Sequence, residues 1–450
     1  MNSDLLPERI HNAYLFQAFN AVSWQICLGS PLILFARELG ASALILGLLA
    51  GLASLTSTLQ LLTAPHADRI GYRKLMVSGW SARVVTLIFL TLLPLSARFW
   101  PHETVLWLLI LVILAFTTLR GLAACTWMPW ITALVPRSLR GFYLSRDRMF
   151  IGVASVAALA ISGAFLFDHG NMLAFAVVFG LSFVSGATSL YFLNRVPDPE
   201  RPLQSETPLA QLRWRDLLRD EAFVRLLIFA AAVQLCVLST ATFITVFVRE
   251  EVALPDGAIL WITAGGALIG IFGLRLLRSH IDGLGSRPFL GMVLLWWTLA
   301  GLVWFALAAG LLPGSWLIAP LLMMAAGFFG SIYELSLTRL LMNTVGDRPG
   351  STQYFALQSV ITSLLAGLAP ILWGWMLDHL ARIQLVVGGL SLNNYALFFG
   401  IQWLLLAVVF ATRMQVQEGS ATATLTLLHR ALLLGPGQHL THRTQPRSRA

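Results

Sequence analysis

The stretch HADRIGYRK, residues 66–74, contains four charged side chains and one glycine within nine residues. Its surroundings are very different, because the segments on both sides run for about twenty residues with almost no charge. Gly71 permits a tight backbone turn that other residues rarely adopt. The sequence therefore predicts a short polar turn that joins two long apolar segments.

The composition of the whole chain indicates a helical membrane protein. The 450 residues are 57% hydrophobic and 11% charged, and mean hydropathy is +0.76. Soluble chains carry about a quarter charged residues. The apolar segments are too long and too uniform for barrel strands. The formal net charge of +9 comes from arginines in the connections, which excludes a nucleic-acid-binding face. The three cysteines fall inside apolar segments, where we interpret them as small apolar residues.

Twelve apolar segments are long enough to cross a membrane. They cover residues 13–36, 42–64, 76–96, 104–132, 148–167, 172–194, 223–248, 257–278, 288–310, 315–342, 353–377 and 393–412. We expect a bundle at 1–195, a cytoplasmic linker with a short amphipathic helix at 196–222, a second bundle at 223–413 and a mostly disordered cytoplasmic tail at 414–450. The N-terminus has no cleavable signal peptide, so the first apolar run is predicted to be the first span.

Arginines also predict the orientation of the chain in the membrane. The even-numbered connections hold most of them, and the odd-numbered connections hold only Arg37, Arg98, Arg249 and Arg382. Because cytoplasmic loops carry an excess of basic residues, both termini are predicted to lie inside. The expected location is the inner (plasma) membrane of the cell, as a multi-pass protein.

Two motifs recur in the same order at nearly the same spacing. The pattern D-x-x-G-x-R occupies residues 68–73 and again 282–287, an offset of 214 residues. Asp168-His169 and Asp378-His379 follow at an offset of 210 residues. Two matches of this kind predict two homologous six-span halves.

The first of these motifs, read with its repeat between spans eight and nine, resembles the signature of the major facilitator superfamily. This resemblance implies two pseudo-symmetric six-helix bundles, with spans 1, 4, 7 and 10 around a central site. It also implies that the turns act as a latch between the halves on the cytoplasmic side. The gate residues so implied are Asp68, Arg69, Gly71, Arg73, Asp282, Gly285 and Arg287. The alternative is that these charges only set the membrane orientation.

Polar residues on those four spans are candidates for substrate binding, because hydrocarbon tolerates them poorly. They are Gln17, Asn20, Trp24, Arg120, Trp127, Gln234 and Glu334. We interpret Arg120 as the only arginine deep in the first half, where it would attract a carboxylate, sulfate or phosphate. Glu334 is the carboxylate expected to carry a coupling proton.

Each candidate has a structural alternative. Polar side chains often join helices without touching substrate, and tryptophans often serve packing or interfacial anchoring. Glu334 has a second interpretation as a brace of the inner gate, paired with Arg275, Arg278 or Arg287. The outer-end residues Asp168 and Asp378 are predicted to be structural.

The predicted function is secondary active transport of a small solute, such as an organic anion, by proton-coupled symport and alternating access. The chain has no nucleotide-binding G-x-x-x-x-G-K-[ST] motif and no paired metal-ligand motif, so we expect no enzymatic activity, cofactor or metal. The expected partners are the solute and membrane lipid, for a monomer. The alternative is a sensor or scaffold of the same fold that binds a partner through its tail, where residues 424–434 form an apolar patch.

Overall fold

A computed structural model describes most of the chain. It covers residues 8–60, 62–63, 66, 70–136, 139–167, 171–198, 217–313, 315–345, 351–381, 385–387 and 390–416. The predicted gate residues Asp68 and Arg69, the predicted amphipathic helix and nearly all of the tail lie outside these residues. No structural statement is made about them.

The described chain is a bundle of long apolar helices, as predicted. The first half contains α1 (His11–Leu28), α2 (Ser30–Glu38), α3 (Ala43–Ser57), α5 (Tyr72–Ser96), α6 (His102–Ala123), η1 (Ala124–Thr126), α7 (Trp127–Leu134), α8 (Arg140–Phe165) and α9 (Met172–Leu193). The second half contains α11 (Glu221–Cys236), η3 (Leu238–Thr240), α12 (Ala241–Glu250), α13 (Asp256–Leu284), α14 (Arg287–Ala308), α15 (Ser315–Val345), α16 (Ser351–Leu380) and α17 (Asn394–Gln415).

These helices confirm the predicted membrane fold. Within the described residues, eleven helical segments are long and apolar enough to cross a membrane. The shorter apolar helix α3 matches the predicted span at 42–64. One element differs from the all-helical prediction. Strands β1 (Leu385–Val387) and β2 (Leu390–Leu392) pair as a small antiparallel hairpin in the last connection.

Three predicted spans are interrupted where the prediction treats them as continuous. The fourth divides into α6 and α7 at the 3-10 turn η1, and the first and seventh divide at positions that correspond in the two halves. The first span divides into α1 and α2 at Gly29, whose backbone is extended. Pro31 explains this break, because proline lacks an N–H and its ring clashes with the carbonyl four residues earlier. The seventh span divides in the corresponding place, at Val237 and the 3-10 turn η3. Broken helices in a membrane are tolerated where the freed backbone is buried in protein or lines a cavity.

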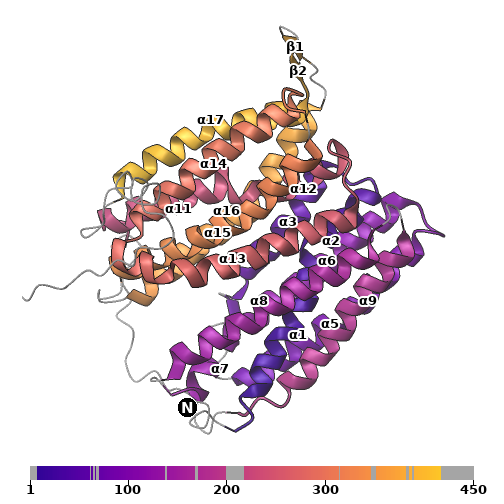
Figure 1. Cartoon of the computed structure of the whole chain (residues 1–450). Coiled ribbons are helices and arrows are strands. Elements are labelled where there is room, and N and C mark those ends of the chain that lie inside the picture. Colours follow the sequence, from indigo (N-terminus) through magenta and orange to yellow (C-terminus); the bar gives the residue numbers. More distant parts are fainter. Residues whose placement is uncertain are drawn as a thin grey trace, which may run out of the picture.

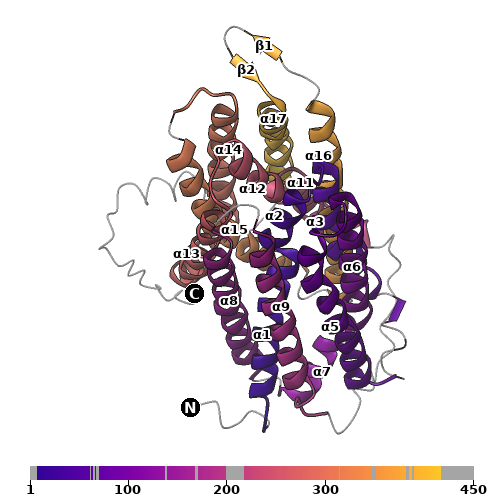
Figure 2. The same ribbon diagram turned by 90° about the vertical axis from the view of Figure 1, so that its right-hand side faces the viewer.

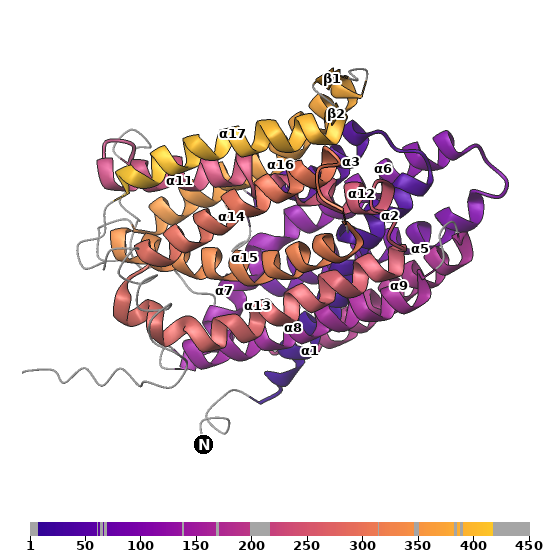
Figure 3. The same ribbon diagram turned by 45° about the horizontal axis from the view of Figure 1, so that its top comes forward.

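The two halves lie side by side, as Figure 1 shows by colour from indigo to yellow. Helix α3 packs against α16, and α8 packs against α13. In Figure 2 the helices run roughly in one direction, with the β1–β2 hairpin at one end. Figure 3 shows α13 and α8 adjacent along the boundary between the halves. We call the end that carries the hairpin and residues 250–256 the hairpin end.

Small residues allow the halves to approach closely along this boundary. A Cβ atom added to Gly51 of α3 would lie 2.1 Å from the backbone oxygen of Gly367 in α16. A Cβ added to Gly257 of α13 would lie 2.3 Å from the oxygen of Gly163 in α8. Glycine at such positions brings helix backbones together and favours van der Waals packing in a membrane.

Candidate functional site

Two reciprocal ion pairs join the halves at the hairpin end. Arg37 of α2 pairs with Glu250 of α12, and Arg249 of α12 pairs with Glu38 of α2. Each half therefore supplies one arginine and one glutamate from adjacent positions. The residues occupy a repeat that the sequence analysis missed, since F-x-R-E occurs at 35–38 and again at 247–250. The arginine of each half pairs with the glutamate of the other half, as expected for two copies related by a twofold axis.

Arg249 is the centre of the larger of the two clusters. Its Nε donates to the Oδ1 of Asp256 at 2.8 Å, and its Nη1 donates to the backbone oxygen of Leu34 at 3.4 Å. On the other pair, the hydroxyl of Tyr395 donates to Glu250 at 2.7 Å. The hairpin end is thus connected by charge-assisted hydrogen bonds, which are stronger than neutral ones.

Asp378 adds a third connection between the halves. Its two carboxylate oxygens accept hydrogen bonds of 2.9 Å from the backbone N–H groups of Ala43 and Leu44, at the start of α3. A carboxylate stabilises the positive N-terminus of a helix. The predicted structural role of Asp378 therefore has a defined contact, whereas its counterpart Asp168 lies outside the described residues.

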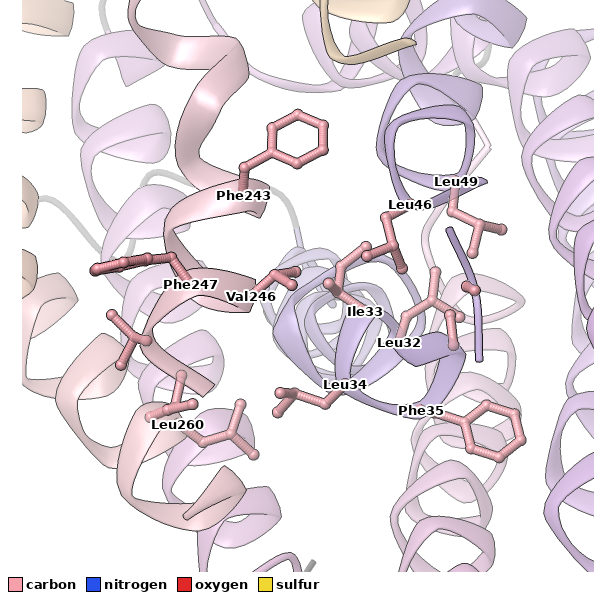
Figure 4. Packing of buried hydrophobic residues seen from close by; sticks show 14 of the residues in the cluster. Leu32, Ile33, Leu34, Phe35, Leu46, Leu49, Phe243, Val246, Phe247 and Leu260 are labelled. Carbon is pink, nitrogen blue, oxygen red and sulfur yellow. The ribbon is translucent and has the colours of Figure 1, made fainter. Parts of the chain in front are cut away.

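An apolar layer accompanies these polar contacts. Ile33 and Leu34 of α2 and Val246 of α12 are nearly fully buried in one cluster. Figure 4 shows Ile33 and Val246 pointing toward one another between the two helices. Between described residues of the two halves, all ion pairs and hydrogen bonds lie at this end. The hairpin end of the protein is therefore closed.

The described gate residues Gly71, Arg73, Gly285 and Arg287 lie at the opposite end. Gly71 and Gly285 both have a positive φ, of 91° and 87°, so the two motifs share the glycine turn that their pattern predicts. Arg73 donates to the backbone oxygen of Asn194 at 2.7 Å, within its own half. The backbone oxygen of Arg287 accepts from Arg413 at 2.9 Å, again within one half. The side chain of Asp282 is outside the described residues, and the latch between the halves remains a prediction.

A cavity of about 570 Å³ lies next to the helix breaks of the first and seventh spans. Leu28 and Ser30 border it at the first break, and Val237 and Thr240 border it at the second. The remaining lining comes mainly from α12, α13, α14 and α15, and no described charged residue takes part. Its size is that of a small-molecule site.

The polar groups of this cavity are neutral. Gln402 donates from Nε2 to the Thr240 hydroxyl at 3.0 Å, and its Oε1 is buried without a hydrogen-bond partner. Thr245 and Trp304 also border the cavity. Hydroxyl, amide and indole groups of this kind bind neutral polar or aromatic parts of a solute.

The seven predicted substrate residues occupy other positions. None of them borders this cavity. Asn20, Trp24 and Arg120 do lie close together, since Asn20 and Trp24 share α1 and the Arg120 guanidinium stacks on the Trp24 ring at 4.1 Å from its centre. Gln17 lies on α1, near Asp147 of α8.

The other three predicted residues are separate. Trp127 stacks on Phe16, with ring centres 4.8 Å apart, inside the first half. Gln234 is half-buried on α11. Glu334 is exposed on α15 and has no hydrogen bond or ion pair to a described residue. The substrate and proton roles assigned to these residues remain predictions.

Two buried charged residues were missed by the sequence analysis. Arg83 on α5 is fully buried, so the interpretation of Arg120 as the only deep arginine of the first half is wrong. Because Arg83 lies well inside the predicted span 76–96, the sequence alone could have indicated a second deep arginine. Asp147 is 6% exposed on α8. It was overlooked because the predicted span began at residue 148, one position later.

The family follows from comparison with known sequences. The profile of the Major Facilitator Superfamily matches residues 13–356. The chain belongs to this superfamily. A search of curated protein sequences finds no match.

Solved structures of transporters share the fold of this superfamily member. A mutant of the nucleoside transporter NupG is similar with a TM-score of 0.70 and 12% identity, over 91% of this chain and 100% of NupG. A D-xylose–proton symporter has a TM-score of 0.67 and 14% identity, over 92% and 97%. A bacterial homolog of the human lysosomal transporter Spinster, inward-facing and occupied, has a TM-score of 0.64 and 15% identity, over 90% of this chain and 95% of the homolog. At these identities the likeness shows the fold alone.

The family assignment and the apolar helices together give the general function. This superfamily member is a multi-pass membrane transporter and not an enzyme.

Proposed function

We propose that this chain is a gradient-driven secondary transporter that moves a small solute by alternating access. The observation that carries the proposal is the closed hairpin end, where crossed Arg–Glu pairs and an apolar layer join two bundles next to a cavity. In alternating access the bundles rock about a fixed midplane site, so the contacts that close one end must break when the other end closes. The more exposed of the two pairs, Arg37–Glu250, suits this role because such a pair is weak enough to break.

The arginine distribution supports an orientation for this state. With both termini inside, the hairpin end faces outward, and the conformation is inward-facing. The predicted latch around Gly71 and Gly285 would then form between the halves in the alternate, outward-facing state.

The two broken helices support the position of the solute site. The breaks in spans 1 and 7 border one cavity, and discontinuous helices of this kind commonly bind solutes in transporters. Proton coupling through Glu334, which is exposed on α15, is the finer proposal for the driving force. Proton-driven uptake that persists in Glu334→Gln would remove this role.

Locking the hairpin end tests the proposal. The purified protein is first screened by thermal shift against nucleosides, sugars, amino acids and carboxylates, because a ligand of the folded state raises apparent stability. Counterflow of the best hit is then measured in proteoliposomes with an Arg37→Cys, Glu250→Cys variant, before and after treatment with a bifunctional maleimide. Cross-linking is expected to abolish flux and to leave the thermal shift intact.

The single variant Arg37→Cys, treated with the same reagent, is the matched control and should keep its flux. Flux that survives cross-linking of both positions would contradict alternating access. A protein that binds the solute but never moves it, with or without the cross-link, would contradict transport of that solute.

A further inference from the structure

Arg83 is a buried guanidinium whose hydrogen-bonding capacity is largely unused. Its Nη2 donates to the Oδ1 of Asn20 at 2.8 Å. Its Nε and Nη1 are buried and have no hydrogen-bond partner among the described residues. Two aromatic rings face the cation, with its central carbon 4.9 Å from the Trp80 ring centre and 4.5 Å from that of Phe116. Buried polar groups are nearly always hydrogen-bonded, so each exception needs an explanation.

Arg120 brings a second cation to the same region. It stands in the last turn of α6 and stacks on Trp24, one turn of α1 away from Asn20. Arg83 and Arg120 thus contact Asn20 and Trp24, which lie four residues apart on α1. None of the described carboxylates forms an ion pair with either arginine. Arg83 is fully buried and Arg120 is partly buried. Two such charges that lack an ion pair with a described carboxylate are unfavourable in a membrane unless another charge compensates them.

We propose that Arg83 and Arg120 form a binding site for an anionic group, with Asn20 and Trp24 as its neutral walls. A carboxylate or another oxyanion matches the planar fork of a guanidinium and accepts two parallel hydrogen bonds from it. Such a fork needs two hydrogens on one edge of the guanidinium. The Nε–H or the Nη1–H of Arg83, each without a described partner, supplies it together with the Nη2–H that does not point to Asn20. One bound anion would also compensate the charge of the arginines.

This inference rests on the proposed function and narrows the class of solute. Trp24 lies four residues before Leu28, which borders the cavity at the first helix break. Residues i and i+4 share a face of a helix and lie about 6 Å apart along its axis. The site is thus placed for a solute whose neutral part fills the cavity and whose anionic end reaches the arginines.

A purely structural role is the competing explanation. Aromatic rings alone stabilise a buried cation through cation–π contacts, and an arginine in the last turn of a helix is favoured by the helix dipole. These contacts account for a stable arginine but predict no response to anions. The response to anions therefore separates the two explanations.

The test measures thermal stability of the purified full chain against sodium salts at constant ionic strength. One arm uses the inorganic anions chloride, sulfate and phosphate, and the other uses acetate, succinate and benzoate. We expect at least one anion to raise the melting midpoint in a saturable way. Arg83→Gln and Arg120→Gln are each expected to weaken its apparent affinity about tenfold or more, since a hydrogen bond to a charged group is lost.

Two further variants keep the result interpretable. Arg98→Gln removes an exposed arginine from the same half and should leave the affinity unchanged. Arg83→Lys keeps the charge without the fork, so it should bind more weakly than the parent and more tightly than Arg83→Gln. Should Arg83→Gln fail to fold, the lysine variant and Arg120→Gln still decide the matter.

The outcomes distinguish this inference from the proposed function. A midpoint that no anion raises, or a shift that both glutamine variants retain, would overturn the anion site while leaving transport of neutral solutes possible. An anion response lost in both variants, without flux of any anion in proteoliposomes, would support the site and contradict transport of that anion. Binding in the inorganic arm alone would identify a free inorganic ion as the occupant.

Discussion

Removal of Arg249 should open the hairpin end far more than removal of Arg37. The Arg249 side chain is 10% exposed and contacts two carboxylates, of Glu38 and the 1% exposed Asp256. The Arg37–Glu250 pair is 31% and 26% exposed. Breaking a buried pair by deleting one partner costs about 3 kcal/mol, whereas an exposed pair contributes about 0.5 kcal/mol. Because 1.4 kcal/mol is a factor of ten, the open fraction should rise about 150-fold in Arg249→Gln and about twofold in Arg37→Gln.

A buried cysteine reports this opening. Val246→Cys, introduced after the three native cysteines are replaced by alanine, places a thiol in the apolar layer between α2 and α12. A water-soluble maleimide reaches it only when the hairpin end opens, so the labelling rate follows the open fraction. The rate should rank Arg249→Gln far above Arg37→Gln, and Arg37→Gln slightly above the parent. Equal rates in all three proteins, or equal effects of the two substitutions, would refute the assignment of Arg249 as the main closure residue.

Three other substitutions test the packing and electrostatics of the helices. Gly51→Val places a side chain against the carbonyl of Gly367 and should destabilise the contact between the halves by about 1–3 kcal/mol. The expected result is faster maleimide labelling of Val246→Cys. Unchanged labelling would contradict the close approach of α3 and α16. Asp378→Ala removes the carboxylate that accepts from the first N–H groups of α3 and should lower stability by about 1 kcal/mol in a melting experiment, whereas Asp378→Asn should lose less. Asp147→Asn removes a buried charge, one of whose carboxylate oxygens has no hydrogen-bond partner among the described residues. The free energy of unfolding should therefore rise by about 1 kcal/mol, which is measured as a higher melting midpoint. A lower midpoint would show that the charge is compensated.

The sequence predicts the broad architecture because the physical constraint is strong. Each apolar run must be long enough to span hydrocarbon, so the positions of the helices follow from hydropathy alone. The repeated D-x-x-G-x-R pattern correctly predicts glycine turns with positive φ at Gly71 and Gly285. The helix breaks are harder to predict, because Pro31 marks the first but no proline marks the one at Val237.

The candidate site was predictable only in part. The spacing of Asn20 and Trp24 places both on one stripe of α1, and the structure adds Arg120 beside them. Arg83 was missed because the search was restricted to spans 1, 4, 7 and 10, and α5 is the third span. The contacts of the hairpin end were missed for another reason. Pairing F-x-R-E with its repeat requires the spatial relation of the two halves, which no local pattern contains.

The crossed pairing of Arg37-Glu38 with Arg249-Glu250 bears on how the contacts that close the hairpin end could have arisen. In a twofold arrangement, one dipeptide meets its own copy and supplies both bonds at once. A single six-helix unit with one such dipeptide would therefore be self-complementary and would close against an identical subunit without any second type of surface. Once the two units are joined in one chain, each bond can vary alone. Asp256 contacts Arg249 in one copy, whereas the corresponding position of the other copy is Leu44.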